Sequence, residues 1–131
     1  ECVLPPCHFC IQFYVRVEEN KMRYLDAQLN IRSSDVILGL PFNIAQWSFV
    51  VYLLCSIVGD LEPGQMNVIL GDCHIYESHI EKAKELIKRT PKCFPQLVIQ
   101  NIHEFIEEYV WEDVELSNYE PHPRMKFEMV A

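Results

Sequence analysis

The sequence predicts an α+β fold in which a mixed or antiparallel sheet packs on a central buried helix and on flanking helices. Three observations predict this class. Two neighbouring segments are rich in β-branched and aromatic residues, a long apolar stretch follows Pro41, and an S-x-x-E pattern at Ser78 opens an amphipathic segment. Strand-like and helix-like segments are intermixed without a regular βαβ period, which favours α+β over a fully parallel α/β fold.

The first two predicted elements are strands that form an antiparallel hairpin. Residues 11–17 and 23–31 have the composition of strands, and the polar run 18–21 between them is typical of a turn. A helix is predicted from Pro41 to about Val58, because proline is favoured in the first turn of a helix. This segment is apolar nearly all round, which places it at the centre of the domain.

The second half of the chain contains shorter predicted elements. Residues 66–70 read as a strand. A helix is predicted to begin at a capping box of Ser78 and Glu81, with Lys88 and Arg89 in its last turn. Further along, the pattern predicts strands at 97–99 and 114–116, an amphipathic turn at 102–106 and a final tail.

Composition excludes several classes of function. The chain has 131 residues, a formal charge of −8 and 50% hydrophobic residues, which is typical of one globular domain over residues 1–131. An acidic chain without a Lys/Arg cluster is not expected to bind nucleic acid or an anionic membrane. The longest apolar stretch, 47–58, is shorter than the ~20 residues that cross a bilayer, and the start at Glu1 shows no signal-peptide pattern.

The cysteines indicate a reducing compartment and one candidate nucleophile. Six cysteines are too sparse for a disulfide scaffold, which predicts free thiols and a cytoplasmic protein. Cys7 follows two prolines that restrict its backbone, and a thiol in a polar setting can act as a nucleophile; the alternative is a buried, inert cysteine. Cys7 and Cys10, with Cys73 and His74 as a second pair, also permit a zinc site, although the adjacent second pair is poorly spaced for tetrahedral binding.

A second candidate site lies where the second predicted strand ends. Arg32, Ser33, Ser34 and Asp35 place a guanidinium, two hydroxyls and a carboxylate in one loop. The fork-shaped donor with adjacent hydroxyls suits a phosphate, and the carboxylate suits the N–H groups of a heterocycle. The same residue types are also typical of a turn that caps a helix, so both interpretations stay open.

Three further polar side chains could recognise a nucleoside. The amide of Asn43 presents a donor and an acceptor, which complement N3–H and O4 of a uracil edge. His74 and Tyr76, separated by Ile75 on an extended segment, are expected to point to the same side and could hold a sugar hydroxyl. The alternatives are an amide satisfied locally near a helix start and a half-buried aromatic pair at a sheet edge.

Several motifs taken together resemble the thymidylate synthase family. They occur in the family's order and cover nearly all of the chain. The motifs in the first half are Leu4-Pro5-Pro6-Cys7-His8 with Gln12-Phe13, and Arg32-Ser33-x-Asp35-x-x-Leu38-Gly39-x-Pro41-Phe42-Asn43. Those in the second half are Gly71-Asp72-x-His74-x-Tyr76-x-x-His79, Phe94-Pro95-x-Leu97, Glu112-Asp113, Tyr119-x-Pro121-His122-Pro123 and the end at 126–131. No general requirement of folding produces this set. The resemblance covers roughly the C-terminal, catalytic half of a family member.

The resemblance implies a reductive methyl transfer from 5,10-methylenetetrahydrofolate to deoxyuridylate (dUMP), giving thymidylate (dTMP). The folate supplies carbon and hydride, so no metal is expected. Cys7 matches the nucleophile that adds to C6 of uracil, and Arg32 would favour its thiolate form. The family pattern places dUMP-binding residues at Arg32, Ser33, Ser34, Asp35, Asn43, His74, Ile75 and Tyr76, and folate-binding residues at Asp35 and Val130 in a tail that closes over the folate.

The resemblance also implies a homodimer packed through large sheets. The sequence departs from the family pattern at Ile31, at Gln46-Trp47 and at Asn118, which flank the predicted site. Two other functions remain alternatives. One is a catalytically inactive or truncated homologue that acts as a nucleotide-binding or dimerising module. The other is deoxycytidylate hydroxymethylase, which Asn43 disfavours because an aspartate is expected there.

Overall fold

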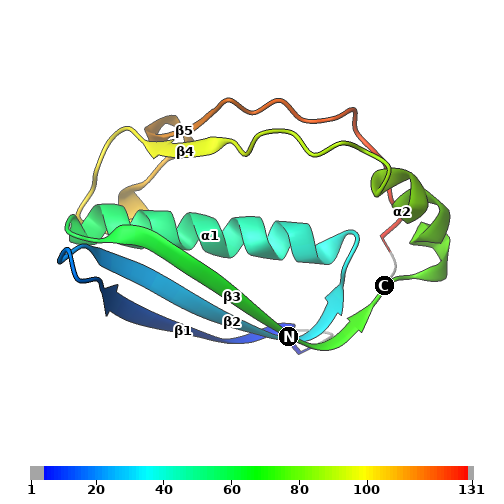
Figure 1. Cartoon of the computed structure of the whole chain (residues 1–131), viewed down its shortest axis with the longest axis horizontal. Helices are drawn as coiled ribbons and strands as arrows, with labels where there is room; N and C mark the ends of the chain where they lie inside the picture. The colour runs from blue at the N-terminus through cyan, green and yellow to red at the C-terminus, as the bar shows by residue number, and fades with distance from the viewer. Residues whose placement is uncertain (1–4, 130–131) are drawn as a thin grey trace.

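In a computed structural model, which describes residues 5–129, one long helix lies between two sheets (Figure 1). The helix α1 (Gly39–Val58) separates a three-stranded sheet of β1 (His8–Val17), β2 (Arg23–Asp35) and β3 (Glu62–His74) from a two-stranded sheet of β4 (Gln96–Ile99) and β5 (Val114–Ser117). The shorter elements are α2 (Ile80–Leu86) and the 3-10 helices η1 (Glu77–His79), η2 (Ile106–Glu108) and η3 (Trp111–Asp113). This content confirms the α+β class.

β1 and β2 form the predicted antiparallel hairpin, in which Phe13 pairs with Ala27. Both strands are longer than predicted, because β1 already begins at His8 and β2 continues to Asp35. The prediction ended the second strand at residue 31, where the sequence becomes polar. Pairing with a third strand keeps the polar residues extended, since Asp35 lies opposite His74 in the β2–β3 register.

β3 runs parallel to β2, so the sheet is mixed. A parallel pair needs a long crossover connection, and α1 supplies it. The predicted strand at 66–70 is therefore only the middle of β3. In such a β–α–β unit the carboxyl ends of both strands and the amino end of the helix meet at one end of the sheet, on the right of Figure 1.

The hydrophobic core lies between β2 and α1. Leu25 and Ala27 of β2 pack against Val51 and Cys55 of α1. The helix lies at the centre of the fold, as predicted. The prediction that it is buried on all sides is wrong for the described residues, because only three of its 20 residues are buried. On the side away from the first sheet, a cavity of about 990 Å³ separates α1 from β4 and β5.

α1 is long and apolar enough to cross a membrane by length and composition alone, with a mean hydropathy of 1.5 and 17% of its window buried. The prediction that this apolar segment is too short to cross a bilayer is therefore wrong, because it counted only residues 47–58 and the helix begins at Gly39. A core helix passes the same test, and α1 packs against strands of both sheets. That the chain has no membrane span stays a prediction.

The capping box predicted at Ser78 is wrong. The chain enters α2 through the 3-10 helix η1, so Ser78 already lies in a helical turn and cannot adopt the extended backbone of a cap. The N-cap position belongs to His79, which makes no side-chain capping bond. α2 also ends at Leu86, which leaves Lys88 and Arg89 beyond it.

The two short strands in the second half are confirmed. β4 and β5 pair antiparallel, with Leu97 opposite Leu116. The segment 102–106 is largely irregular and leads into η2. β4 and η2 contact α1 and hold the second half of the chain against it.

Candidate active site

The predicted site residues gather where β2 and β3 end and α1 begins. Ligands of open sheets with parallel strands bind at the carboxyl ends of those strands, and a helix amino end adds N–H groups that favour an anion. The start of β1 reaches the same place, because His8 pairs with Ile31 near the end of β2. Three separate segments of the chain therefore meet at this end of the sheet.

Cys7 lies one residue before β1 and is exposed, which excludes the alternative of a buried cysteine. Arg32 holds the segment that carries it. The backbone N–H of Arg32 donates to the carbonyl of Cys7 at 2.9 Å, while Nε donates to Pro6 at 3.2 Å and Nη2 to Pro5 at 2.7 Å. A guanidinium has five N–H donors, so this exposed side chain keeps others for a ligand.

Ser33 and His74 share the carboxylate of Asp72. Ser33 Oγ donates to Asp72 Oδ2 at 3.3 Å, and His74 Nδ1 bonds the same oxygen at 2.8 Å. An ionised carboxylate only accepts, so Nδ1 carries the proton in this bond. Asp72 was not predicted as a site residue, although its spacing of two from His74 on an extended segment puts both on one side.

Asp35 shapes the turn that leads into α1. Its Oδ1 accepts the backbone N–H groups of Ile37 at 3.0 Å and of Leu38 at 3.3 Å, so the turn-forming interpretation of this residue is confirmed. Asn43 lies beside the same turn. A Cβ placed on Gly39 would lie 3.6 Å from Asp35 Cβ and 4.0 Å from Asn43 Nδ2.

The half-buried amide of Asn43 forms no hydrogen bond with any residue in the range 5–129. The alternative of an amide satisfied by its own helix is therefore wrong for the described residues. The donor and the acceptor of Asn43 remain available to a ligand at the amino end of α1.

His74 and Tyr76 lie on the same side of the segment after β3, as their alternation predicts. Their ring centroids are 5.0 Å apart in an edge-to-face arrangement. Ile75 between them is 47% exposed. The pair therefore borders the site at the carboxyl end of β3, next to the Asp72 carboxylate.

The strands approach unusually closely at this point because Gly71 has no side chain. A Cβ at Gly71 would lie 2.7 Å from the carbonyl oxygen of Arg32, which no real contact of this kind tolerates. The glycine thus lets β3 run directly beside the residue that holds the Cys7 segment.

Two predicted site residues are not among these groups. Ser34 is buried, with 2% of its surface exposed, opposite Cys73 in the β2–β3 register. Val130 lies outside the described residues. The segment just before it reaches the site, because His79 Nε2 bonds the carbonyl of Glu128 at 2.7 Å.

Sequence patterns missed two contacts that join distant segments. Trp47 Nε1 donates to His8 Nδ1 at 3.1 Å, which links α1 to the residue after Cys7. His79 is almost completely buried, with 1% exposed, between Asp35 and the C-terminal segment. No spacing signal identifies either contact, because each joins residues more than 35 positions apart.

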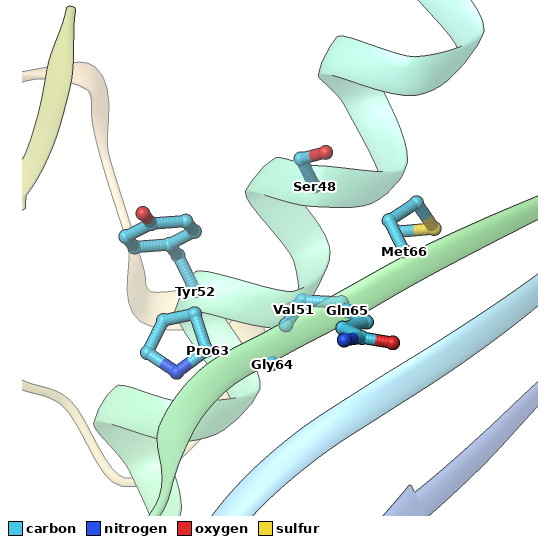
Figure 2. Close-up of a pocket in the computed structure, with 7 residues that line it drawn as sticks. All are labelled: Ser48, Val51, Tyr52, Pro63, Gly64, Gln65 and Met66. Atoms are coloured by element: carbon cyan, nitrogen blue, oxygen red, sulfur yellow. The ribbon is translucent and has the colours of Figure 1, made fainter.

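The pockets lie away from these residues. Figure 2 shows a pocket of about 110 Å³ between α1 and β3, in which Ser48, Val51 and Tyr52 face the segment 63–66. The larger cavity between α1 and the second sheet is lined mainly by apolar and aromatic side chains. None of the predicted site residues lines either of these two pockets.

The described cysteines divide by environment. Cys7, Cys10, Cys73 and Cys93 are exposed free thiols, whereas Cys55 is buried and burial raises its pKa to about 11. Within residues 5–129, no group of three His, Cys, Asp or Glu side chains is arranged to hold a metal ion.

Comparison with known proteins identifies the family. The sequence model of the thymidylate synthase family matches residues 1–131. The chain is 44% identical over 128 residues to the thymidylate synthase of Homo sapiens, covering 98% of this chain and 39% of that protein. It is 41% identical over 131 residues to the thymidylate synthase of Mycoplasma pneumoniae, covering 100% of this chain and 43% of that protein.

A third relative carries a second activity in its name. The chain is 43% identical over 128 residues to the bifunctional dihydrofolate reductase-thymidylate synthase of Leishmania amazonensis, covering 98% of this chain and 24% of that protein. The chain thus spans less than half the length of these curated relatives. With a match over its full length and these identities, the chain belongs to the thymidylate synthase family.

Proposed function

We propose that the protein containing this chain methylates dUMP at C5 to form dTMP, with 5,10-methylenetetrahydrofolate as the co-substrate. Family membership supports the proposal. The observation that carries it is the contact between Arg32 and the Cys7 segment, because three hydrogen bonds from Arg32 hold the backbone that carries an exposed thiol. This pairing suits a substrate that has both an electrophilic ring carbon and a phosphate.

Cys7 is the proposed nucleophile. Its thiolate adds to C6 of uracil, and the electron pair of the C5–C6 bond moves to make C5 nucleophilic toward the one-carbon unit. The folate supplies the methylene carbon and a hydride. C5 then loses its proton as the bond between the methylene carbon and the folate nitrogen breaks, which leaves an exocyclic methylene on C5. The hydride adds to this carbon to make the methyl group, and the Cys7 sulfur leaves C6 as a thiolate, which restores the C5–C6 double bond and releases dTMP and dihydrofolate.

Arg32 and Ser33 are proposed to bind the phosphate of dUMP. Two N–H groups of the guanidinium are used by Pro5 and Pro6, and the remaining ones can donate to phosphate oxygens. The amino end of α1 lies at the same end of the sheet and favours negative charge there. The phosphate would therefore anchor the nucleotide beside the Cys7 segment.

Asn43 is proposed to select uracil. Its amide can accept from N3–H and donate to O4, whereas cytosine presents an unprotonated N3 and an amino group. Asp35 supports this edge from the neighbouring turn, as the position of Gly39 between the two side chains indicates. Asn43 therefore disfavours the deoxycytidylate hydroxymethylase alternative.

His74 and Tyr76 are proposed to hold the 3′-hydroxyl of the deoxyribose. Because Nδ1 of His74 carries the proton that bonds Asp72, Nε2 of the neutral ring is an acceptor for a hydroxyl. The edge-to-face contact with Tyr76 keeps both rings at the carboxyl end of β3. Ile75 and Ser34 complete the proposed nucleotide-binding set, with Ser34 as a buried support of the β2 backbone.

We also propose a cytoplasmic homodimer. The face of the first sheet opposite α1 carries Tyr14, which is 67% exposed, and Ile69, which is 50% exposed, on the side away from Leu25 and Leu29. An exposed sheet face with apolar residues is a suitable surface for a second copy. Folate binding is assigned to Asp35 and to Val130, and the free thiols are consistent with a reducing compartment.

The proposal is tested by mass spectrometry of the full gene product after incubation with 5-fluorodeoxyuridylate and 5,10-methylenetetrahydrofolate. The fluorinated nucleotide lacks the C5 proton whose loss completes the reaction, so a covalent ternary adduct accumulates. We expect the adduct in the wild type and in Cys10→Ala, which removes a neighbouring exposed thiol. Cys7→Ala should form none.

Two outcomes would overturn the proposal. An adduct that persists in Cys7→Ala would assign the nucleophile to another thiol. The absence of any adduct from a folded wild type would favour the alternative of an inactive homologue, which is then tested by its affinity for dUMP alone.

A further inference from the structure

His79 occupies an unusual position between two parts of the site. It lies at the end of η1 and is 1% exposed. Its Nδ1 is 3.9 Å from Asp35 Oδ1, in the turn that leads to Asn43, and its Nε2 bonds the carbonyl of Glu128 at 2.7 Å. One buried ring therefore faces the nucleotide-binding turn on one edge and the C-terminal segment on the other.

The protonation of the ring follows from its partners. A backbone carbonyl only accepts, so Nε2 carries the proton in the bond to Glu128. Nδ1 has no hydrogen-bond partner among residues 5–129, although it is fully buried. A buried polar atom without a partner is uncommon in folded proteins, so the position of this ring calls for an explanation.

The aromatic surroundings keep this ring in place. Its centroid lies 5.7 Å from that of Tyr76 and 5.2 Å from that of Phe127, both edge to face. Phe127 is also covered by Lys82 of α2, whose Nζ lies 5.9 Å from the ring centroid and donates to the carbonyl of Lys126. The segment 126–128 is thus fastened from η1 and from α2.

We propose that His79 is a positioning residue that holds the C-terminal segment against the nucleotide-binding turn. Through this contact, residues 126–128 are held next to Asp35, which is assigned to folate binding. Because 1% of its surface is exposed, we assign His79 no contact with either substrate. The inference rests on the proposed function for its effect on folate, but the contact between His79 and residues 126–128 is testable without turnover.

The test compares two substitutions in the full gene product. His79→Gln keeps an N–H that can reach the carbonyl of Glu128, whereas His79→Phe keeps the aromatic volume and removes the donor. The matched control is His122→Phe, because His122 Nε2 makes the same kind of bond to the carbonyl of Thr90, at 2.8 Å, on a different surface.

The first readout is hydrogen exchange in peptides that contain residues 126–129. We expect faster exchange in His79→Phe than in the wild type, with His79→Gln close to wild type and His122→Phe unchanged. Equal exchange in His79→Phe and the wild type would overturn the inference, whatever the activity of the protein.

The second readout is kinetic. We expect His79→Phe to raise the KM for folate by at least about fivefold, a typical coupling between sites, with the Kd for dUMP unchanged. A general loss of structure would instead weaken dUMP and folate alike in both His79 variants, and that result would contradict a positioning role. If the wild type forms no covalent adduct, the proposed function is refuted. Hydrogen exchange at residues 126–129 then still tests whether His79 holds residues 126–128.

Discussion

Replacing Gly71 by alanine tests how closely β3 must approach β2 at the site. The added Cβ would lie 2.7 Å from the carbonyl oxygen of Arg32 and 3.3 Å from its carbonyl carbon. Both atoms are backbone in the central strand, so they cannot rotate away as a side chain could. To reach an ordinary contact of 3.4 Å, the strands must separate by about 0.7 Å.

The expected loss of stability in Gly71→Ala follows from the rigidity of the Arg32 backbone in β2. Inserting one carbon into a well-packed position costs about 1–3 kcal/mol. The same displacement moves Arg32, whose backbone and guanidinium hold Cys7, Pro6 and Pro5. Because a misplacement of about 1 Å can reduce a rate about 100-fold, we expect kcat/KM for dUMP to fall by about tenfold or more.

The assay combines urea unfolding and steady-state kinetics on the full gene product. The midpoint should fall while the dependence of the unfolding free energy on urea stays constant. Gly39→Ala is the matched control for stability, because its Cβ would make only an ordinary contact of 3.6 Å with Asp35 and alanine is favoured in a helix. If Gly71→Ala unfolds within about 0.5 kcal/mol of the wild type, the reasoning about close approach is refuted.

Three other predictions follow from single contacts. Arg32→Lys keeps the charge but has one donor nitrogen in place of the two that bond Pro5 and Pro6, so kcat/KM for dUMP should fall at least about tenfold; an unchanged value would show that charge alone suffices. Cys55, whose pKa is raised to about 11 by burial, should resist alkylation at pH 8 in the native protein, whereas exposed Cys93 reacts; modification of both at equal rates would contradict the burial. The backbone N–H of Val110 and the amide of Asn101 lower the pKa of Asp113, so its ionised form stabilises the fold above about pH 4 and that stabilisation is lost as pH falls. Urea midpoints between pH 3 and pH 6 should therefore vary less in Asp113→Asn than in the wild type, and a parallel pH dependence in both would refute this assignment.

The family was predicted more accurately than the bounds of the elements. The motif around Cys7, Arg32, Asn43 and His74 was sufficient to identify the family, which the full-length match confirms. These residues carry the proposed chemistry, and each motif is short enough to be identified without knowledge of the fold. The structure adds a role for Asp72, a motif residue that was not predicted to belong to the site, because its carboxylate joins Ser33 to His74.

The sequence by itself determined the local elements: the hairpin, the apolar helix and the two short strands, because side-chain periodicity and turn residues act over a few positions. Only the tertiary structure decided that β2 continues through the polar residues to Asp35, that β3 runs parallel beside it, and that His79 lies between Asp35 and Glu128. These features depend on contacts between residues far apart in the chain. Such contacts form only when the strands pack and the close approach at Gly71 permits it, so no local pattern encodes them.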